Sequence, residues 1–488
     1  MNSKFYDIIF WVIVLFTIFV IMSGSYLPMV DLPQHAGQVA VLDDIIKNRS
    51  PWSSLVELNF TTPYLCGYLT WLFLAQFFDI ITSSRILVSL SFLLFVFSFK
   101  LLAKLLNASN LVKWISIPTF FGFCYDWGFA TYLLATSVGL LFFCFNINWL
   151  NNKKLLNILL ILIFSIVLYF SHMLSYLFFC LLSFLYVCFS LDKVSDFLKI
   201  SYIYIFNFCL LIFYFLKGDS LSGLYGYGMS VQFQGFWDKI IYLLAYPFSM
   251  MGDIYIVIGL FFLIFPFLAN YKLTKDKKRY IPLFVCLICW FSLPHFLHNT
   301  YFIYERYSIL FFGFYYLIFD SKNNFKYLIY LKSIFLMVLI YTLILDYKNI
   351  IFSKKESQNF ERVLVDMKPE KKLLTVIFEP SGYTLTTPYT YVHFGSWYQA
   401  QKRGWSDFNF AWFHPQIVRY MPDTVPKLIK PGIEWGPIKA MESCQEYDLL
   451  LIRVYNPMIK NFMAQKNCAN YILRSHQGEW YLYEKGIK

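Results

Sequence analysis

An acidic residue and a histidine stand four positions apart at the start of one predicted helix. The stretch Leu27–Lys47 reads LPMVDLPQHAGQVAVLDDIIK, with Asp31 and His35 on either side of Pro33. Proline is favoured in the first turn of a helix, and residues four apart share one helix face. A carboxylate there can take a proton from a hydroxyl group, while the imidazole orients the carboxylate or binds a phosphate. The plainer interpretation, which composition alone favours, is a capping box formed by Asp31 and Gln34.

A charged pair within an apolar run is the second candidate. Glu305 and Arg306 stand near the start of the predicted membrane span 302–320. A charge at mid-bilayer costs roughly 2.5–3.5 kcal/mol, so it seldom lacks a role. A guanidinium can hold a phosphate with two parallel hydrogen bonds; the alternative is an anchor at the membrane surface. Because adjacent helical residues point apart, we expect Glu305 and Arg306 to have different partners.

Three histidines and one aromatic–acid pair complete the candidate set. His172, His295 and His298 could bind the same anion as Arg306, although each alone is more often structural. Asp126 beside Trp127 could bind the edge and the face of a sugar ring, and a structural role is again the commoner one. The sequence indicates no metal site and no other cofactor.

The composition shows what must position these residues. Of the 488 residues, 58% are hydrophobic and 14% are charged, and the mean hydropathy is +0.54. Soluble domains carry roughly 25% charged residues. The net charge of +12 is spread over short loops between apolar runs, which sets membrane orientation and forms no surface that reads nucleic acid. We therefore expect a polytopic α-helical membrane protein and exclude an ordinary cytosolic enzyme.

The apolar runs predict about eleven transmembrane helices. They cover residues 5–23, 62–80, 84–104, 128–148, 155–171, 173–191, 198–216, 254–270, 280–297, 302–320 and 327–346. The basic loop Lys272–Arg279 is expected to be cytoplasmic, which makes the N-terminus cytoplasmic as well. Residues 111–127, interrupted by Pro118 and Gly122, are predicted to be a re-entrant or half-buried segment on the outer side.

That assignment conflicts with the charge rule at one place. It puts Lys100, Lys104 and Lys113 toward the outside, so ten or twelve crossings stay open.

Two predicted domains follow from the spans. Residues 1–349 form the transmembrane domain, with a first outer loop over 24–61 and a Gly- and aromatic-rich outer loop over 217–240. Within the first loop, an apolar stripe predicts a helix on the outer membrane face. Residues 350–488 lose membrane character and alternate short β-type runs with helical stretches, so we expect an outer α/β domain.

The outer domain contains only two cysteines, Cys444 and Cys468. In an oxidising compartment such a pair is a disulfide candidate, and two buried free thiols are the alternative.

Several patches give the chain a resemblance to a known superfamily. The loop Asp31-Leu32-Pro33-Gln34-His35 resembles the first outer loop of GT-C glycosyltransferases, which take sugars from polyprenyl-phosphate carriers. Further patches similar to bacterial GT-C proteins run through most of the chain: Asp126–Leu134, Tyr169–Ser175, Glu305–Tyr307 and Val392–Tyr398. Gln34 stands where that family often has Asn, and the usual Arg after the histidine is missing. The second acid of the family's loop is missing too, so a divalent metal stays open.

The resemblance implies a GT-C-like fold in a bacterial inner membrane with a periplasmic C-terminal domain. It implies an inverting glycosyltransferase that moves a sugar from a polyprenyl (undecaprenyl) phosphate to an envelope glycan or lipid, such as lipopolysaccharide O-antigen. The length and layout are also similar to those of O-antigen-modifying glucosyltransferases. In this reading Asp31 is the catalytic base with His35 beside it, and Arg306 with one or more histidines binds the phosphate. The alternatives are a transporter or flippase for a lipid-linked glycan, and a structural subunit of an envelope complex.

Overall fold

The structure is a computed structural model, and it describes most of the chain. The described residues are 3–191, 194–216, 230–297, 300–320, 328–385, 387–413, 415–425, 444–454, 468 and 470–486. His298 and most of the predicted outer loop, residues 217–229, lie outside these ranges.

The chain divides into two compact units. The first unit comprises Met1–Phe19, Pro63–Gly67 and Leu87–Lys348. The second comprises Val20–Thr62, Tyr68–Ile86 and Asn349–Lys488. The first outer loop and the C-terminal tail therefore belong to the same unit, whereas the sequence divides them between two domains.

The helices begin and end as follows. In the N-terminal half they are α1 (Ser3–Ser23), α2 (Leu32–Ile46), α3 (Leu65–Ala75), α4 (Ile80–Leu105), α5 (Leu111–Thr119), α6 (Phe123–Asp126), α7 (Ala130–Asn152), α8 (Leu155–Tyr169), α9 (Met173–Cys188) and α10 (Val194–Leu216). Further along they are α11 (Phe236–Ala245), α12 (Asp253–Leu268), α13 (Ile281–Ser292), α14 (Ser308–Leu317), α15 (Leu328–Glu356), α16 (Gln358–Asp366) and α17 (Gly395–Lys402).

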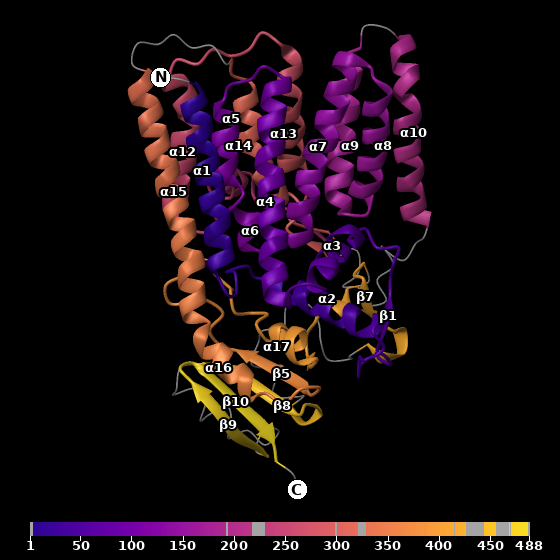
Figure 1. Cartoon of the computed structure of the whole chain (residues 1–488), viewed down its shortest axis with the longest axis vertical. Helices are drawn as coiled ribbons and strands as arrows, with labels where there is room; N and C mark the ends of the chain where they lie inside the picture. Colours follow the sequence, from indigo (N-terminus) through magenta and orange to yellow (C-terminus); the bar gives the residue numbers. More distant parts are fainter. Residues whose placement is uncertain are drawn as a thin grey trace. The chain divides into compact units, whose positions relative to one another are not determined.

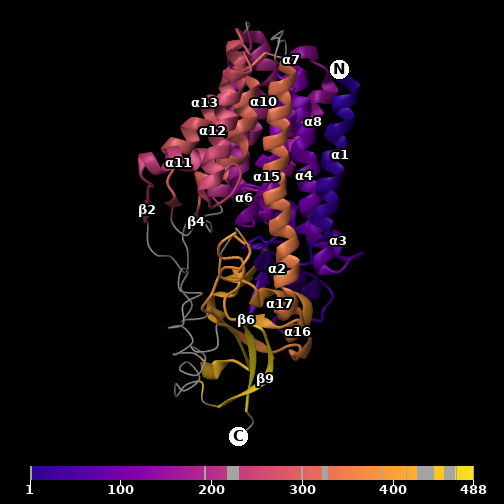
Figure 2. The same cartoon turned by 90° about the vertical axis from the view of Figure 1, so that its left-hand side faces the viewer.

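The first unit is a bundle of apolar helices. Figure 1 shows α7, α8 and α9 side by side, and Figure 2 shows α11 beside α12. Within the described residues, four helical runs are long and apolar enough to cross a membrane: α1, α4, α7, and the run that begins with α15. Large apolar side chains such as Phe19, Ile163 and Val257 are exposed on helix surfaces. Such surfaces suit contact with lipid.

The predicted span 62–80 is wrong, because α3 has 11 residues. At 1.5 Å per residue it covers about half of a hydrocarbon core that is roughly 30 Å thick. The chain turns after Ala75, and the Asp79 carboxylate accepts hydrogen bonds from the backbone N–H groups of Ile81 (3.0 Å) and Thr82 (2.9 Å). Asp79 therefore begins α4 as a new helix.

The placement of residues 111–127 on the outer side is also wrong. Near one end of α14, Ala108 and Asp320 form an antiparallel β-bridge. Oδ1 of Asp320 lies 2.9 Å from Nη1 of Arg279 in the basic loop. Near the other end, the Cys124 thiol contacts the Arg306 carbonyl oxygen at 3.4 Å. The stretch through α5 and α6 thus runs along α14 from one end to the other as a helix broken after Pro118.

This path removes the conflict with the charge rule. Lys113 and Lys100 both form ion pairs with Asp7 of α1. Lys100 and Lys113 therefore lie at the same end of the first unit as the N-terminus, together with the basic loop. Their clustering with that loop is the pattern expected of a cytoplasmic end.

The second unit contains a five-stranded mixed sheet, in the order β6-β5-β8-β10-β9. Its strands are β5 (Lys372–Ile377), β6 (Trp405–Ser406), β8 (Leu449–Arg453), β9 (Tyr471–Gln477) and β10 (Trp480–Lys485). β5 is parallel to β6 and β8, and β10 is antiparallel to β8 and β9. A separate pair joins β1 (Val56–Leu58) of the first outer loop to β7 (Val418–Tyr420) of the tail. In the first unit, β2 (Val231–Gln232), β3 (Phe296–Leu297) and β4 (Thr300–Tyr301) form a small antiparallel sheet.

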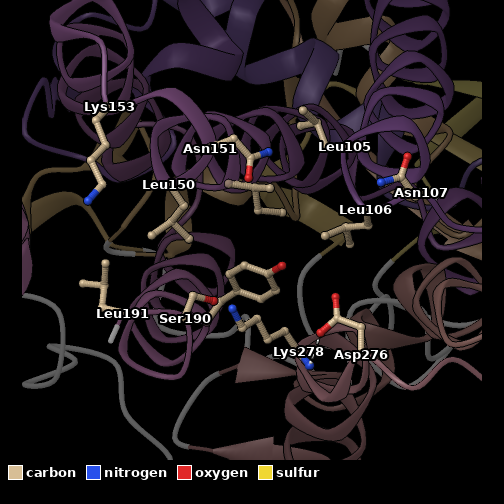
Figure 3. A pocket seen from close by; sticks show the side chains of 12 residues that line it. Leu105, Leu106, Asn107, Leu150, Asn151, Lys153, Ser190, Leu191, Asp276 and Lys278 are labelled. Atoms are coloured by element: carbon tan, nitrogen blue, oxygen red, sulfur yellow. Dashed lines mark hydrogen bonds between the residues drawn. The ribbon is translucent and has the colours of Figure 1, made fainter. Parts of the chain in front are cut away.

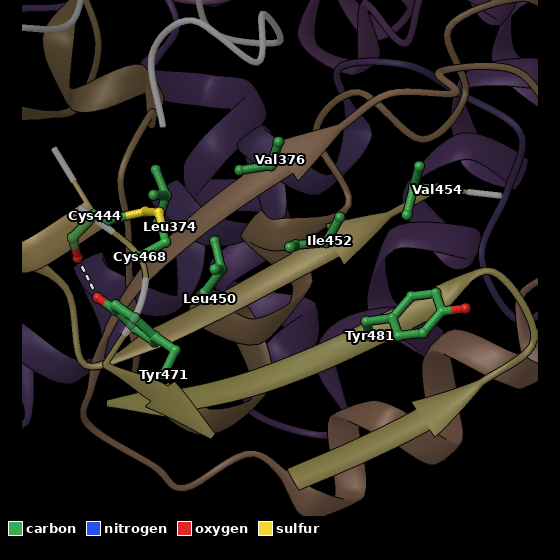
Figure 4. Packing of buried hydrophobic residues seen from close by; sticks show 9 residues of the cluster. All are labelled: Leu374, Val376, Cys444, Leu450, Ile452, Val454, Cys468, Tyr471 and Tyr481. Atoms are coloured by element: carbon green, nitrogen blue, oxygen red, sulfur yellow. Dashed lines mark hydrogen bonds between the residues drawn. A yellow bond between two sulfur atoms is a disulfide. The ribbon is translucent and has the colours of Figure 1, made fainter. Parts of the chain in front are cut away.

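A disulfide closes one side of this unit's core. Cys444 and Cys468 are bonded, with 5.6 Å between their Cα atoms, so the predicted disulfide is confirmed. Figure 4 shows the bond packed against Leu374 and Leu450 of neighbouring strands. The alternative of two free thiols is excluded.

Candidate functional site

Asp31 lies at the N-terminus of α2 but does not cap it. Its backbone carbonyl accepts the helix bond from the N–H of His35 (3.1 Å), whereas its side chain makes no capping hydrogen bond. The capping-box interpretation is therefore wrong. The predicted surface helix is instead buried on all sides over Leu32–Val39, and Asp31 itself is 8% exposed. A carboxylate buried to this degree is normally paired with another group.

An imidazole from the C-terminal tail faces this carboxylate. Nε2 of His393 lies 3.5 Å from Oδ1 of Asp31, and both side chains are largely buried. The His393 ring stacks on Phe408, with 5.6 Å between centroids and 22° between planes. His393 is in the segment just before α17, so the second unit brings the start of α2 and the tail together.

Gln34 connects the same histidine to the backbone. Its Oε1 accepts a hydrogen bond from the N–H of Phe410 (3.0 Å), and its Nε2 donates to the carbonyl oxygen of Phe408 (3.2 Å). Nε2 also lies 3.3 Å from Nδ1 of His393. Gln34 therefore fixes the 408–410 segment and the imidazole together, which is a positioning role.

His35 lies in a different hydrogen-bond chain. Its Nδ1 is 2.7 Å from the hydroxyl oxygen of Tyr68, and that hydroxyl donates to Oε1 of Gln416 at 2.5 Å. Because the hydroxyl has a single proton, Nδ1 of His35 is the donor toward Tyr68. The structure thus places His35 within the same unit as Asp31, with Tyr68 fixing its ring.

A second carboxylate on α2 provides a contrast. Asp44 is also buried, but Arg49 donates to it at 2.5 Å. Burial raises the pKa of Asp44, and the hydrogen bond from Arg49 opposes that rise. Asp44 is therefore accounted for by an ion pair with a neighbouring residue.

In the first unit, Arg306 is a buried guanidinium. Arg306 is 9% exposed, its Nε donates to the Phe302 carbonyl oxygen (3.0 Å), and its guanidinium lies 3.9 Å from the Phe129 ring centroid. The Arg306 carbonyl oxygen accepts from the Tyr132 hydroxyl at 2.8 Å. Among the described residues, no carboxylate forms an ion pair with this guanidinium. Buried charges are normally paired, so the arrangement suits an anion.

His172 faces Arg306 with a proton-bearing nitrogen. Its Nδ1 accepts a hydrogen bond from the backbone N–H of Leu174 (3.2 Å), which places the proton of the neutral ring on Nε2. Nε2 lies 3.0 Å from Nη1 of Arg306. The side chains of Arg306 and His172 are therefore in direct contact, and a guanidinium beside an imidazole is suited to binding an anion. The sequence predicted both residues as anion ligands, and the structure brings them together.

Glu305 and Arg306 have different partners, as expected. Oε1 of Glu305 pairs with Nδ1 of His295, and its buried Oε2 has no hydrogen-bond partner among the described residues. Glu305 is 2% exposed. His295 is therefore engaged by Glu305, separately from the Arg306–His172 pair.

Asp126 and Trp127 have packing roles in the first unit. Oδ2 of Asp126 accepts hydrogen bonds from the Ser249 hydroxyl and the Met250 N–H, both at 2.9 Å. The Trp127 ring packs on Phe302, with 4.2 Å between centroids. These contacts support the structural interpretation, and sugar binding by either residue stays a prediction.

The sequence did not single out His393 or Gln34 as site residues. His393 stands in the Val392–Tyr398 patch that carried part of the resemblance, so a signal was present. Which imidazole would meet Asp31 depends on how the tail folds onto α2, and local periodicity does not encode that.

A cavity of about 460 Å³ lies elsewhere in the first unit. The ends of α4, α7 and α9 enclose it, and Figure 3 shows Asn151, Lys153 and Lys278 around it. It adjoins the end of α14 where Ala108 pairs with Asp320, and Arg306 precedes the other end of that helix. It contains none of the predicted site residues.

Comparison with solved structures identifies the fold. The chain is similar to a mutant form of the arabinofuranosyltransferase AftD from mycobacteria, with a TM-score of 0.52 and 11% identity; the match covers 100% of this chain and 42% of AftD. ArnT from Cupriavidus metallidurans matches with TM-scores of 0.47 when bound to undecaprenyl phosphate and 0.46 in the apo state, at 8% and 10% identity, over 99% of this chain and 98% of ArnT. No protein-family model and no curated protein matches the chain. The likeness to AftD shows a shared fold, in agreement with the fold that the sequence resemblance implied.

Proposed function

We propose that this protein is an inverting glycosyltransferase that moves a sugar from a polyprenyl phosphate to a hydroxyl group of an envelope glycan or lipid. The observation that carries the proposal is the state of Asp31: a buried carboxylate at the start of α2 that does not cap the helix and faces an imidazole. The fold is a second support.

In the proposed reaction, Asp31 takes the proton of the acceptor hydroxyl as its oxygen attacks the anomeric carbon of the sugar. The new C–O bond forms from the face opposite the phosphate, the bond between the anomeric carbon and the phosphate oxygen breaks, and the configuration inverts. The electron pair leaves with the polyprenyl phosphate. General-base assistance of this kind typically contributes about 10²–10⁴-fold in rate.

Arg306 and His172 are proposed to bind the donor phosphate. A phosphate oxygen would accept from Nη1 of Arg306 and Nε2 of His172, which converge within 3.0 Å. As the bond to the sugar breaks, negative charge grows on the phosphate, so these donors stabilise the transition state more than the ground state. We place the reaction on the periplasmic face of a bacterial inner membrane, with the N-terminus cytoplasmic and O-antigen as one class of acceptor.

The test is a transfer assay in detergent. Purified protein is incubated with a panel of undecaprenyl-phosphate hexoses and pentoses and with total envelope glycolipid, and glycosidic products are detected by mass spectrometry. A glycosyltransferase forms product in micelles, because the reaction needs no separated compartments. Absence of product across the panel, together with movement of the same donors across proteoliposomes, would favour the transporter instead.

A further inference from the structure

We propose that His393 is the positioning residue of Asp31, and that Gln34 sets its tautomer. The inference rests on the proposed function of Asp31 as base and adds a role for the C-terminal tail in the reaction.

The argument begins with the orientation of the Gln34 amide. The backbone N–H of Phe410 can only donate, so the atom facing it at 3.0 Å must be Oε1 of Gln34. The amide nitrogen therefore faces the carbonyl oxygen of Phe408 (3.2 Å) and Nδ1 of His393 (3.3 Å). The orientation of the amide is fixed because one backbone partner, Phe410, is a donor and the other, Phe408, is an acceptor.

This orientation decides where the imidazole proton is. An NH₂ group donates, so Nδ1 of His393 accepts and the neutral ring has its proton on Nε2. Nε2 is the atom that lies 3.5 Å from Oδ1 of Asp31. His393 thus presents an N–H to the carboxylate, and the separation shortens to a hydrogen bond with a small adjustment, as catalytic contacts often do when substrate binds.

The same geometry assigns the base to Asp31 and excludes His393. Both ring nitrogens of His393 face protein groups, Gln34 on one side and Asp31 on the other, so the ring is engaged at both ends. Stacking on Phe408 further restricts the ring. A carboxylate has about four lone-pair sites, and the N–H of His393 faces one oxygen of Asp31.

The C-terminal tail therefore takes part in catalysis, because its residue His393 positions the carboxylate of Asp31. His393 fixes the rotation of the Asp31 side chain, and a misplacement of a reacting group by about 1 Å can cost roughly 10²-fold in rate. His393 acts through Asp31 and, in this inference, contributes to the rate of transfer but little to donor binding.

The experiment measures kcat and the donor KM in the detergent transfer assay for wild type, His393→Ala, His393→Gln, Asp31→Asn and the double variant Asp31→Asn/His393→Ala. Gln can bring an amide N–H to the place of Nε2. We expect His393→Ala to lower kcat up to about 10²-fold with an unchanged donor KM. We expect His393→Gln to recover most of the loss, and the double variant to match Asp31→Asn.

The outcomes separate the inference from the proposed function. An inactive Asp31→Asn together with a wild-type kcat in His393→Ala overturns the positioning role, and so does a His393→Gln that is no better than His393→Ala. A raised donor KM in His393→Ala also contradicts it. Near wild-type transfer by Asp31→Asn would overturn the proposed base itself, whatever the His393 variants do.

Discussion

Nη1 of Arg306 lies 3.0 Å from Nε2 of His172, and both atoms bear protons because Leu174 occupies the other nitrogen of the imidazole. Buried charges are normally paired, and the described residues give the Arg306 guanidinium no ion pair, so this contact suits the binding of an anion. Binding of the polyprenyl-phosphate sugar donor can therefore be measured separately from proton transfer to Asp31.

We predict that Arg306→Ala weakens the binding of undecaprenyl phosphate about 10- to 100-fold, because hydrogen bonds to charged groups contribute roughly 1.5–3 kcal/mol. Arg306→Lys should be intermediate, since an ammonium keeps the charge and loses the planar pair of donors. Titration of the purified variants with undecaprenyl phosphate measures the effect. Lys278→Ala, in the basic loop, is the control and should bind as wild type does. Equal affinity in Arg306→Ala would remove Arg306 from the phosphate site.

Gln34→Ala should lower the stability of the second unit. The change leaves the buried N–H of Phe410 and the carbonyl oxygen of Phe408 without this partner, at about 1–3 kcal/mol for each group. Thermal unfolding in detergent should show a lower midpoint, whereas the exposed Gln76→Ala should change little. An unchanged midpoint in Gln34→Ala would show that the 408–410 segment does not depend on this amide.

Removal of the disulfide should also destabilise the second unit. Cys444→Ser/Cys468→Ser opens a loop whose ends are 24 residues apart in sequence, for which chain entropy predicts a loss of about 3 kcal/mol. Thermal unfolding of the variant, compared with wild type before and after reduction, measures the loss. Reduction should lower the wild-type midpoint and leave the variant unaffected. Intact-mass analysis without reduction that finds both native thiols free would contradict the bond.

The orientation predicts opposite labelling of two engineered cysteines. Lys275→Cys, in the exposed basic loop, should resist a membrane-impermeant maleimide in intact cells, and Val365→Cys, 74% exposed on α16, should react. Wild type, with its native cysteines, provides the background signal, and both positions should react in lysed cells. The reverse pattern would place Asp31 on the cytoplasmic face.

Much of the fold could be predicted from the sequence, because membrane helices need long apolar runs. The error at residues 62–80 arose because composition allowed a crossing, while the break depends on Asp79, whose side chain begins α4. The same error forced residues 111–127 to the wrong side. The predicted outer positions of Lys100 and Lys113 violated the positive-inside rule, and this violation was the sign in the sequence that the assignment was wrong.

The candidate site could be predicted only in part. Asp31 and His35 were visible because they are close in sequence and follow a membrane helix. The alternative interpretation, in which Asp31 caps α2, failed because capping depends on a side-chain rotamer that tertiary packing sets. The contact between Asp31 and His393 joins the first loop to the tail, and contacts between distant segments have no local pattern.

The central claim is that Asp31 is the base, and Asp31→Asn tests it most directly. Asn keeps the size and polarity of Asp and removes the proton acceptor. The measurement is single-turnover sugar transfer by purified protein saturated with donor, alongside donor affinity in the same sample, with Asp44→Asn as the matched control from α2. We expect Asp31→Asn to bind donor as wild type does and to transfer about 10²–10⁴-fold more slowly, while Asp44→Asn keeps its rate. Transfer by Asp31→Asn at the wild-type rate would contradict the account.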